Sequence, residues 1–289
     1  MLTQNTPTTL DQFEAKVDHH FAKGDGTSIH YASLGDGPLI VFLHGFPDHW
    51  LTWWKQMDAL SQNYQTAALD MRGYNLSAQP DALESYAAGH LVQDVLSVIE
   101  HCGHKQAIVV GHDWGGHVAW QLAMTRPEYL SKLAIVNMPH PWAIYRELAN
   151  NPDQQQASAY VRLFQQEQAH LGLDFSQLST WIKDPEFKER HLLAMSRSNP
   201  NAMLNYYRKC FPAPPYEEKT EPPQSVLSPT LVIHGLEDPY ALPSGLNGLW
   251  QWVNAPLTLK TLPNVGHFVQ QDAPDELTKI LSVWLESED

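Results

Sequence analysis

Short apolar runs alternate with helical patterns along the first half of the chain. Residues 38–43 read PLIVFL and residues 107–110 read AIVV, two continuous runs typical of strands that are buried on both faces. Between them, residues 86–102 carry apolar side chains at a helical period and stop before Gly103, as a helix with a glycine cap would. This alternation predicts βα units on a largely parallel sheet.

The same patterns predict the other elements of the core. The expected strands cover residues 13–21, 28–34, 38–43, 66–69, 107–110, 133–136, 230–233 and 257–261. The expected helices cover residues 86–102, 118–124, 245–253 and 274–286. These elements predict an α/β fold with an eight-stranded, mostly parallel sheet flanked by helices.

The alternation stops after Pro139. Residues 141–223 are helical in pattern and poor in strands, with a glutamine-rich portion at 154–168 and a proline cluster near the end. We interpret this segment as a helical cap, or lid, domain inserted into a core domain formed by residues 1–140 and 224–289. No internal repeat of fixed period is visible.

Composition narrows the possible functions. The chain has 289 residues, of which 43% are hydrophobic, enough for a large core and too apolar for a disordered protein. Its formal charge of -14 argues against nucleic-acid binding, because phosphates would be repelled. It has no apolar run long enough to span a membrane and no basic, apolar start, so we expect a cytoplasmic protein without membrane association. The two cysteines form no disulfide framework.

A sharp turn follows the AIVV run. Residues 111–116 read GHDWGG and lead at once into a helix, which is the pattern of a nucleophile elbow with Asp113 in place of serine. Such a turn strains the backbone of its central residue and presents that side chain above the strand ends. It also places Asp113 at a helix N-terminus, which favours the ionised carboxylate. The alternative is that Asp113 only caps the helix.

Two further residues complete a catalytic trio in chain order. Asp238 follows the LVIHG strand, and His267 lies in NVGHF, so nucleophile, acid and histidine come in the order that an α/β-hydrolase fold requires. Taken alone, Asp238 could be a turn residue and His267 a surface histidine, one of 15 in the chain. Asn137 follows another strand, but an amide cannot carry the charge of the acid.

The HGFP sequence at residues 44–47 ends the third strand, where this fold supplies one amide of an oxyanion hole. The residue after the nucleophile supplies the other. We therefore predict that the backbone N–H groups of Phe46 and Trp114 form the oxyanion hole. A cis Phe46-Pro47 bond would be one way to aim this loop. The alternative is a simple turn.

In these features the chain resembles the epoxide hydrolases of the α/β-hydrolase fold, which are related to the haloalkane and fluoroacetate dehalogenases. The resemblance covers nearly the whole chain through HGFPDHWLTWWKQM, LDMRGYNLSAQP, GHDWGGHVAW, NMPHP, NYYR, HGLEDPY and NVGHF. It implies hydrolysis of an epoxide to a vicinal diol through a covalent ester on Asp113, with water activated by His267 and Asp238. One departure is Asn75, where relatives usually have glycine; asparagine tolerates the left-handed backbone of that turn.

The resemblance also implies two cap tyrosines that hold the epoxide oxygen. Tyr207 matches the second aromatic residue of NYYR, and Tyr160 matches the other tyrosine less closely. Both could instead be ordinary packed tyrosines. We expect Phe46, Trp114 and Tyr206 to line the substrate pocket, although adjacent residues such as Tyr206 and Tyr207 point about 100° apart on a helix.

Other functions remain as alternatives. A dehalogenase on the same fold also uses an aspartate, but Phe46 stands where haloalkane dehalogenases usually have asparagine, and Trp114 where fluoroacetate dehalogenases have arginine. A catalytically silent ligand-binding homologue is a second alternative. We expect no cofactor and no metal, because His101 and His104 lack a third ligand nearby. The expected partners are a small apolar epoxide and water, and the chain is expected to be a monomer or homodimer.

Overall fold

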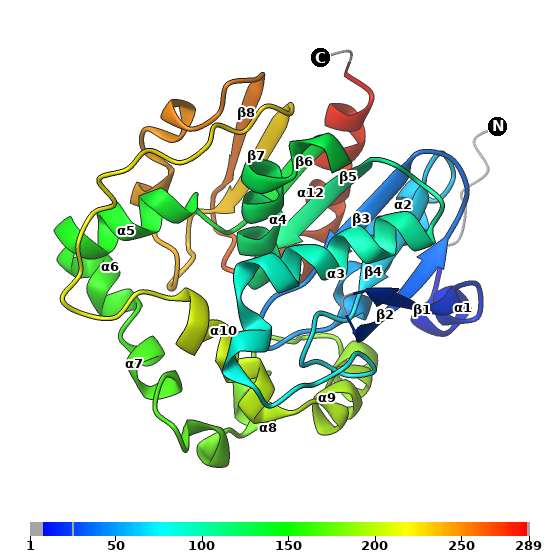
Figure 1. The fold of residues 1–289 in the computed structure, drawn as a ribbon. Helices are drawn as coiled ribbons and strands as arrows, with labels where there is room; N and C mark the ends of the chain where they lie inside the picture. The colour runs from blue at the N-terminus through cyan, green and yellow to red at the C-terminus, as the bar shows by residue number, and fades with distance from the viewer. Residues whose placement is uncertain (1–7, 25, 288–289) are drawn as a thin grey trace.

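An eight-stranded sheet runs through the centre of the molecule in the order β1-β2-β4-β3-β5-β6-β7-β8 (Figure 1). The computed structural model describes residues 8–24 and 26–287. Strand β2 pairs antiparallel with β1 and β4, and all the other pairs are parallel, so the predicted sheet is confirmed. The strands are β1 (Asp18–Gly24), β2 (Thr27–Leu34), β3 (Leu39–Leu43), β4 (Gln65–Leu69), β5 (Ala107–His112), β6 (Leu130–Val136), β7 (Thr230–Gly235) and β8 (Leu257–Leu262).

Both faces of the central strands are covered by helices. In β3, Val41 and Leu43 belong to the core beneath α3 and α4, whereas Ile40 and Phe42 belong to the core beneath α2 and α12. This two-sided burial explains why the central strands are continuous apolar runs rather than alternating ones. The covering helices are α2 (Trp54–Leu60), α3 (Ala88–His101), α4 (Trp114–Thr125) and α12 (Pro274–Leu285).

The segment between β6 and β7 forms a separate group of helices beside the sheet, drawn in green and yellow in Figure 1. The helices are α5 (Pro141–Asn150), α6 (Pro152–Ala157), α7 (Tyr160–Phe164), α8 (Phe175–Leu178), α9 (Pro185–Arg197) and α10 (Pro200–Cys210), with the 3₁₀ turn η4 (Ala169–Gly172). This is the segment in which the sequence predicts a cap. Its helices pack over the end of the sheet at which β3 and β5 finish, where Phe164 and Tyr207 contact Phe46.

The predicted strand at residues 13–21 is wrong in its first half. A short helix, α1 (Leu10–Glu14), precedes β1, because Thr9 and Gln12 form a capping box in which each side chain bonds the other's backbone amide. Phe13 is fully buried and packs against Trp50 and Trp54.

The predicted helix at residues 245–253 is also wrong. The structure has two 3₁₀ turns there, η5 (Pro243–Leu246) and η6 (Leu249–Gln251). Gly248 separates them in a left-handed conformation with φ of 71°, which interrupts a right-handed helix. The other short elements are η1 (Trp50–Trp53), η2 (Leu83–Tyr86), η3 (Pro127–Tyr129) and α11 (Val269–Asp272).

Within residues 8–24 and 26–287, no helix is both long enough and apolar enough to cross a membrane.

Candidate active site

Asp113 occupies a strained turn between β5 and α4. Its backbone has φ of 51° and ψ of −121°, outside the regions that L-residues prefer. Close packing around the turn requires glycine: a Cβ on Gly45 would overlap the Asp113 side chain, and a Cβ on Gly115 would overlap the carbonyl of Leu43. The turn therefore presents the carboxylate at the carboxyl end of the sheet, where neighbouring strands β3 and β5 diverge to their next elements.

The side chains of His267 and Asp238 join Asp113 at this edge. His267 donates from Nδ1 to Oδ2 of Asp238 at 2.7 Å, and its Nε2 lies 3.6 Å from Oδ2 of Asp113. All three side chains are buried. The structure thus brings together the three residues that the sequence predicts, with the imidazole between the two carboxylates.

Asn137 positions the acid of this trio. Its Nδ2 donates to Oδ2 of Asp238 at 2.7 Å, and its Oδ1 accepts the N–H of Gly235 at 3.1 Å. The other oxygen of Asp238 accepts the N–H groups of Tyr240 and Ala241. Sequence reasoning noted Asn137 at a strand end but missed this role. The Asn137 amide donates a hydrogen bond to the Asp238 carboxylate, which remains the acid of the trio.

The backbone around the elbow supplies N–H donors. The Phe46 N–H donates to Oδ1 of Asp113 at 2.8 Å, after the turn at the end of β3. Trp114 is the first residue of α4, and amides in the first turn of a helix have no acceptor within that helix. The Phe46-Pro47 peptide bond is cis. Phe46 therefore contacts the Asp113 carboxylate through its amide, and Trp114 directly follows Asp113 in the chain.

Electrostatic interactions fix the charges of the trio. Burial alone would raise the pKa of Asp113, but hydrogen bonding and attraction from His267 and the Phe46 amide hold that pKa below its usual value. The pKa of Asp238 is also lowered despite burial, chiefly through His267. Burial would lower the pKa of His267, yet Asp238 and Asp113 raise it to about 10. The two carboxylates therefore favour the protonated form of the His267 imidazole.

Tyr160 and Tyr207 face the same space as Asp113. The two rings lie 6.1 Å apart, and Tyr207 also packs edge-on against Trp114 and Phe46. Burial and the nearby Asp113 charge raise the pKa of both phenols, so both keep their protons at neutral pH. These are the two tyrosines that the resemblance indicates.

The prediction that Tyr206 lines the pocket is wrong. Tyr206 is fully buried, and its hydroxyl donates to the carbonyl oxygen of Arg72 at 2.8 Å. Its ring packs against Tyr74, Tyr86 and Trp114, behind the wall of the pocket. Tyr206 and Tyr207 are adjacent on α10, so only one of them can face the cavity.

Two cavities meet at the elbow and share Asp113, Tyr160, Tyr207, Tyr240 and His267. One of them is largely aromatic, with the further lining residues Phe46, Pro47, Phe164, Leu178, Trp181 and Phe268. The other is mixed and is lined in addition by His117, Met138, Ile144, Gln154, Ser158 and Phe211, among others. A ligand that reaches Asp113 can thus place substituents on either side of it.

Sequence reasoning missed Tyr240. Its ring stacks edge-on against His267 at 5.1 Å and against Tyr160 at 5.5 Å, and it lines both cavities. The only signal in the sequence is its position two residues after Asp238. The histidine pair considered as metal ligands lies elsewhere: His101 contacts Tyr31, and His104 contacts Gln65.

Comparisons with known proteins identify the family of this chain. Residues 38–274 match the family described as the alpha/beta hydrolase fold. Epoxide hydrolase 3 of Xenopus tropicalis is 33% identical over 92% of this chain and 77% of its own length. Epoxide hydrolase 1 of Caenorhabditis elegans is 32% identical over 93% of this chain and 70% of its own length.

Solved structures give the same result. An inhibitor complex of an epoxide hydrolase from Bacillus megaterium has a TM-score of 0.84 and 34% identity, covering 93% of this chain and 100% of that one. A complex of a mutant of that enzyme with a naphthyloxy-propanediol product has a TM-score of 0.83 and 33% identity over the same shares. The chain therefore belongs to the alpha/beta hydrolase fold family and, within it, to the group formed by these epoxide hydrolases.

Proposed function

We propose that this protein hydrolyses epoxides to vicinal diols through a covalent ester on Asp113. The observation that carries the proposal is the placement of a buried carboxylate between an imidazole and two protonated tyrosines at the meeting point of two cavities. Nucleophile, proton donors and base thus surround one position that a small ligand can reach.

In the first step, one oxygen of Asp113 attacks a ring carbon of the epoxide from the side opposite the ring oxygen. The carbon–oxygen bond of the ring breaks, and the leaving alkoxide is a strong base that needs a proton. Tyr160 and Tyr207 hold this oxygen and supply the proton, since both phenols are protonated at neutral pH.

In the second step, water attacks the ester carbonyl carbon of Asp113. His267 accepts a proton from this water while Asp238 stabilises the imidazolium that forms. The tetrahedral oxyanion is stabilised by the N–H groups of Phe46 and Trp114. The intermediate then collapses: the bond between the carbonyl carbon and the diol oxygen breaks, this oxygen takes a proton from the His267 imidazolium, and the Asp113 carboxylate is restored. Of the two protons of water, one ends on this hydroxyl and the other replaces the proton that the tyrosines gave to the ring oxygen, so only water is consumed.

Formation of the ester also prepares His267 for this second step. In the resting site, attraction and hydrogen bonding from Asp113 help to raise the pKa of His267 to about 10. The ester has no negative charge, so this contribution disappears and the pKa of His267 falls. The proton that His267 then gives up returns to the phenolate left by the first step, so a neutral imidazole is available to act as the base.

The cavities support an epoxide with an apolar substituent. The aromatic cavity offers ring faces and edges to such a group, and the mixed cavity has apolar walls at Met138, Ile144 and Phe211 for the other side of the molecule. The Bacillus megaterium relative, which holds a naphthyloxy-propanediol product, is an example of a bulky aromatic group in this fold.

A single turnover in ¹⁸O-labelled water tests the covalent route. With enzyme in excess over substrate, the diol formed first is expected to carry only unlabelled oxygen, because the added oxygen comes from the Asp113 carboxylate. Label then appears in Asp113, which mass spectrometry of the peptide around residue 113 detects. Label in the first diol would exclude the ester.

Substitution of the tyrosines tests their proposed role. Tyr207→Phe and Tyr160→Phe are each expected to slow ester formation by about 10²–10⁴-fold, the usual contribution of a positioned proton donor. Rapid-quench measurement of the first turnover isolates this step.

The matched control is Tyr206→Phe, the neighbour on the same helix. It removes the buried hydrogen bond to the Arg72 carbonyl and is expected to lower the free energy of unfolding by about 1 kcal/mol, with ester formation changed by less than about threefold. Equal loss of ester formation in all three variants would show that the tyrosines act only through packing. A halide-release assay beside an epoxide panel tests the dehalogenase alternative.

A further inference from the structure

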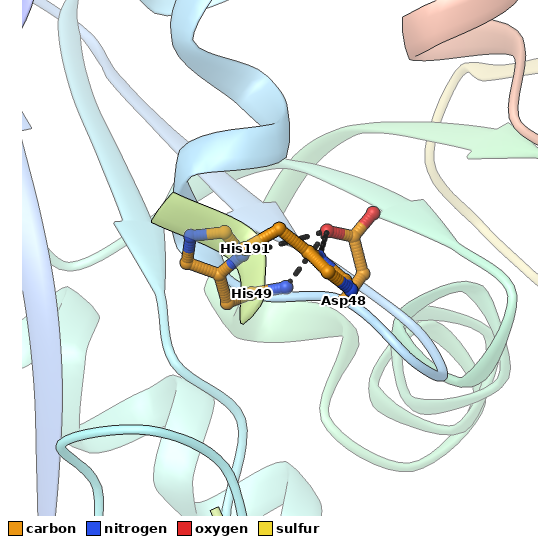
Figure 2. A group of neighbouring side chains, drawn as sticks. All are labelled: Asp48, His49 and His191. Atoms are coloured by element: carbon orange, nitrogen blue, oxygen red, sulfur yellow. Dashed lines mark hydrogen bonds and ion pairs between the residues drawn. The ribbon is translucent and has the colours of Figure 1, made fainter. Parts of the chain in front are cut away.

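A second group of polar side chains lies where the helices of the 141–223 segment meet the core. Asp48 and His49 follow the HGFP turn after β3, and His191 comes from the middle of α9 (Figure 2). Their exposed fractions are 0%, 2% and 0%. None of the three lines either cavity at the elbow, so this cluster has no part in the proposed reaction.

The two imidazoles turn their Nδ1 atoms toward one carboxylate oxygen without bonding it. Nδ1 of His49 lies 3.7 Å and Nδ1 of His191 lies 3.8 Å from Oδ1 of Asp48. Both distances are too long for a hydrogen bond, and neither nitrogen has another hydrogen-bond partner among residues 8–24 and 26–287. Two buried, unpartnered nitrogens therefore point at the same buried carboxylate.

The Asp48 carboxylate has few hydrogen bonds for a fully buried charge. Its Oδ1 accepts the N–H of His49 at 2.9 Å, and its Oδ2 has a long contact of 3.5 Å with Nε2 of Gln270. A buried carboxylate that stays ionised needs a close positive charge.

The arrangement fits a small divalent cation. One ligand atom from each residue lies within 4.8 Å of the other two. In a tetrahedral zinc site with bonds of about 2.0–2.1 Å, neighbouring ligand atoms are about 3.4 Å apart. The observed separations of 3.7 and 3.8 Å reach this value if each side chain moves by a few tenths of an ångström.

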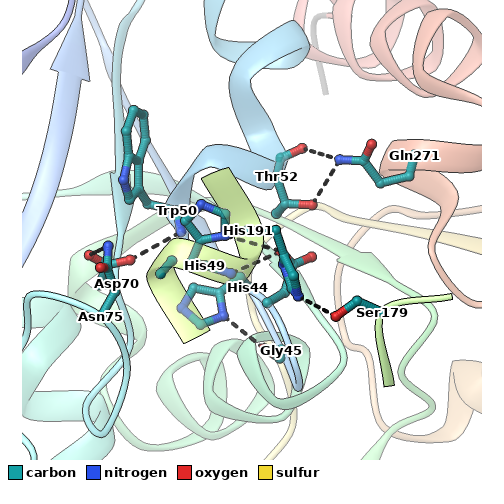
Figure 3. A network of polar contacts seen from close by, with 12 residues as sticks. His44, Gly45, His49, Trp50, Thr52, Asp70, Asn75, Ser179, His191 and Gln271 are labelled. Atoms are coloured by element: carbon teal, nitrogen blue, oxygen red, sulfur yellow. Dashed lines mark hydrogen bonds and ion pairs between the residues drawn. The ribbon is translucent and has the colours of Figure 1, made fainter. Parts of the chain in front are cut away.

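The orientation of His191 also suits a metal ligand. Its Nε2 lies 2.8 Å from Oγ of Ser179 (Figure 3). This contact holds the ring with its Nδ1 on the side of Asp48. Metal-bound histidines usually bond a second group through the other ring nitrogen in this way.

We propose that Asp48, His49 and His191 bind one Zn²⁺-type transition-metal ion that ties α9 to the loop after β3. Two imidazole nitrogens and one carboxylate oxygen are the ligands of zinc rather than of calcium or magnesium. The role is structural, because the cluster is buried away from both cavities. Bound metal neutralises Asp48 and joins a helix of the inserted segment to the loop that carries the Phe46 amide.

Metal binding by the whole protein tests the proposal. The protein is treated with a chelator, transferred to metal-free buffer, and titrated with ZnCl₂ and separately with CoCl₂. Bound metal is counted by atomic emission after gel filtration. The visible absorption spectrum of bound Co²⁺ shows whether the ion has nitrogen and oxygen ligands in a tetrahedral rather than an octahedral arrangement. At about 100 times Kd, Zn²⁺ is expected to raise the unfolding temperature by roughly 5 °C.

The location of the ion is tested with His191→Gln and Asp48→Asn. Each is expected to bind one equivalent fewer of Zn²⁺ than the parent and to lose the rise in unfolding temperature and the Co²⁺ absorption. His170→Gln is the matched control, because His170 also lies in the inserted segment but outside the cluster, and it is expected to behave like the parent. Two variants guard against a folding defect in either one.

Two results would overturn the proposal. The first is that the parent protein binds neither ion. The second is that the number of bound ions and the rise in unfolding temperature are the same in both variants as in the parent, which would place the ion at another of the chain's histidines.

Discussion

Replacing Asp113 with asparagine is expected to lower epoxide turnover by about 10⁴-fold, a loss comparable to that seen when a catalytic triad loses one member. The amide has nearly the same shape and its oxygen can still accept the Phe46 N–H, but it lacks the negative charge needed to attack carbon. Steady-state diol formation, followed by chromatography, measures this loss. The same variant should form no covalent adduct with a reactive epoxide.

The matched control is Asp36→Asn, which makes the same chemical change at an exposed position in the loop before β3. Turnover by this variant should equal that of the parent. Thermal unfolding of Asp113→Asn checks that the fold is intact. Turnover by Asp113→Asn within tenfold of the parent would rule out Asp113 as the nucleophile.

The parts of the fold that sequence predicts well are those in which local pattern and tertiary packing agree. The β3 and β5 runs are apolar on both faces because helices cover both faces, so any reading of their hydrophobicity finds strands. At Phe13 the two disagree. Its aromatic, alternating surroundings favour a strand, but the Thr9 and Gln12 capping box starts a helix of five residues that is too short to show a period.

The catalytic trio is predictable because each member directly follows a strand, and parallel strands bring their carboxyl ends to one edge. Chain order then separates nucleophile, acid and base. The supporting residues are not predictable in this way. The contact of Asn137 with Asp238 depends on the paths of two loops, and so does the stacking of Tyr240 on His267.

The choice between Tyr206 and Tyr207 shows a different limit. Both are aromatic, both are buried and they are adjacent on α10, so the sequence alone allows either to face the cavity. Tertiary packing decides which of them faces the cavity. The Tyr206 hydroxyl bonds the Arg72 carbonyl, whereas Tyr207 lines the same cavity as Asp113. The sequence does not predict the cluster of Asp48, His49 and His191 for a related reason. His191 comes close to the other two residues only when the inserted segment packs against the core.

His267→Gln separates the two steps of the proposed reaction. Glutamine cannot take a proton from water, so the ester is expected to form and then persist. One equivalent of substrate should therefore remain covalently bound to each enzyme molecule. Steady-state turnover should fall by about 10⁴-fold. Intact-protein mass spectrometry should show an increase equal to the mass of the epoxide. His104→Gln, a histidine far from the elbow that contacts Gln65, is the control and should show no adduct.

The pH dependence of this labelling adds a test of the charges. The interactions with His267 contribute most to lowering the pKa of Asp113, so without the imidazolium that pKa rises. A larger fraction of Asp113 is then protonated in acid, and His267→Gln should form the adduct faster at pH 8 than at pH 5. In the parent, Asp113 stays ionised over this range, so the first turnover should lose less of its rate at pH 5. An adduct that fails to form at either pH, in a folded variant, would contradict an ester on Asp113, because the attacking group needs no base to open the ring.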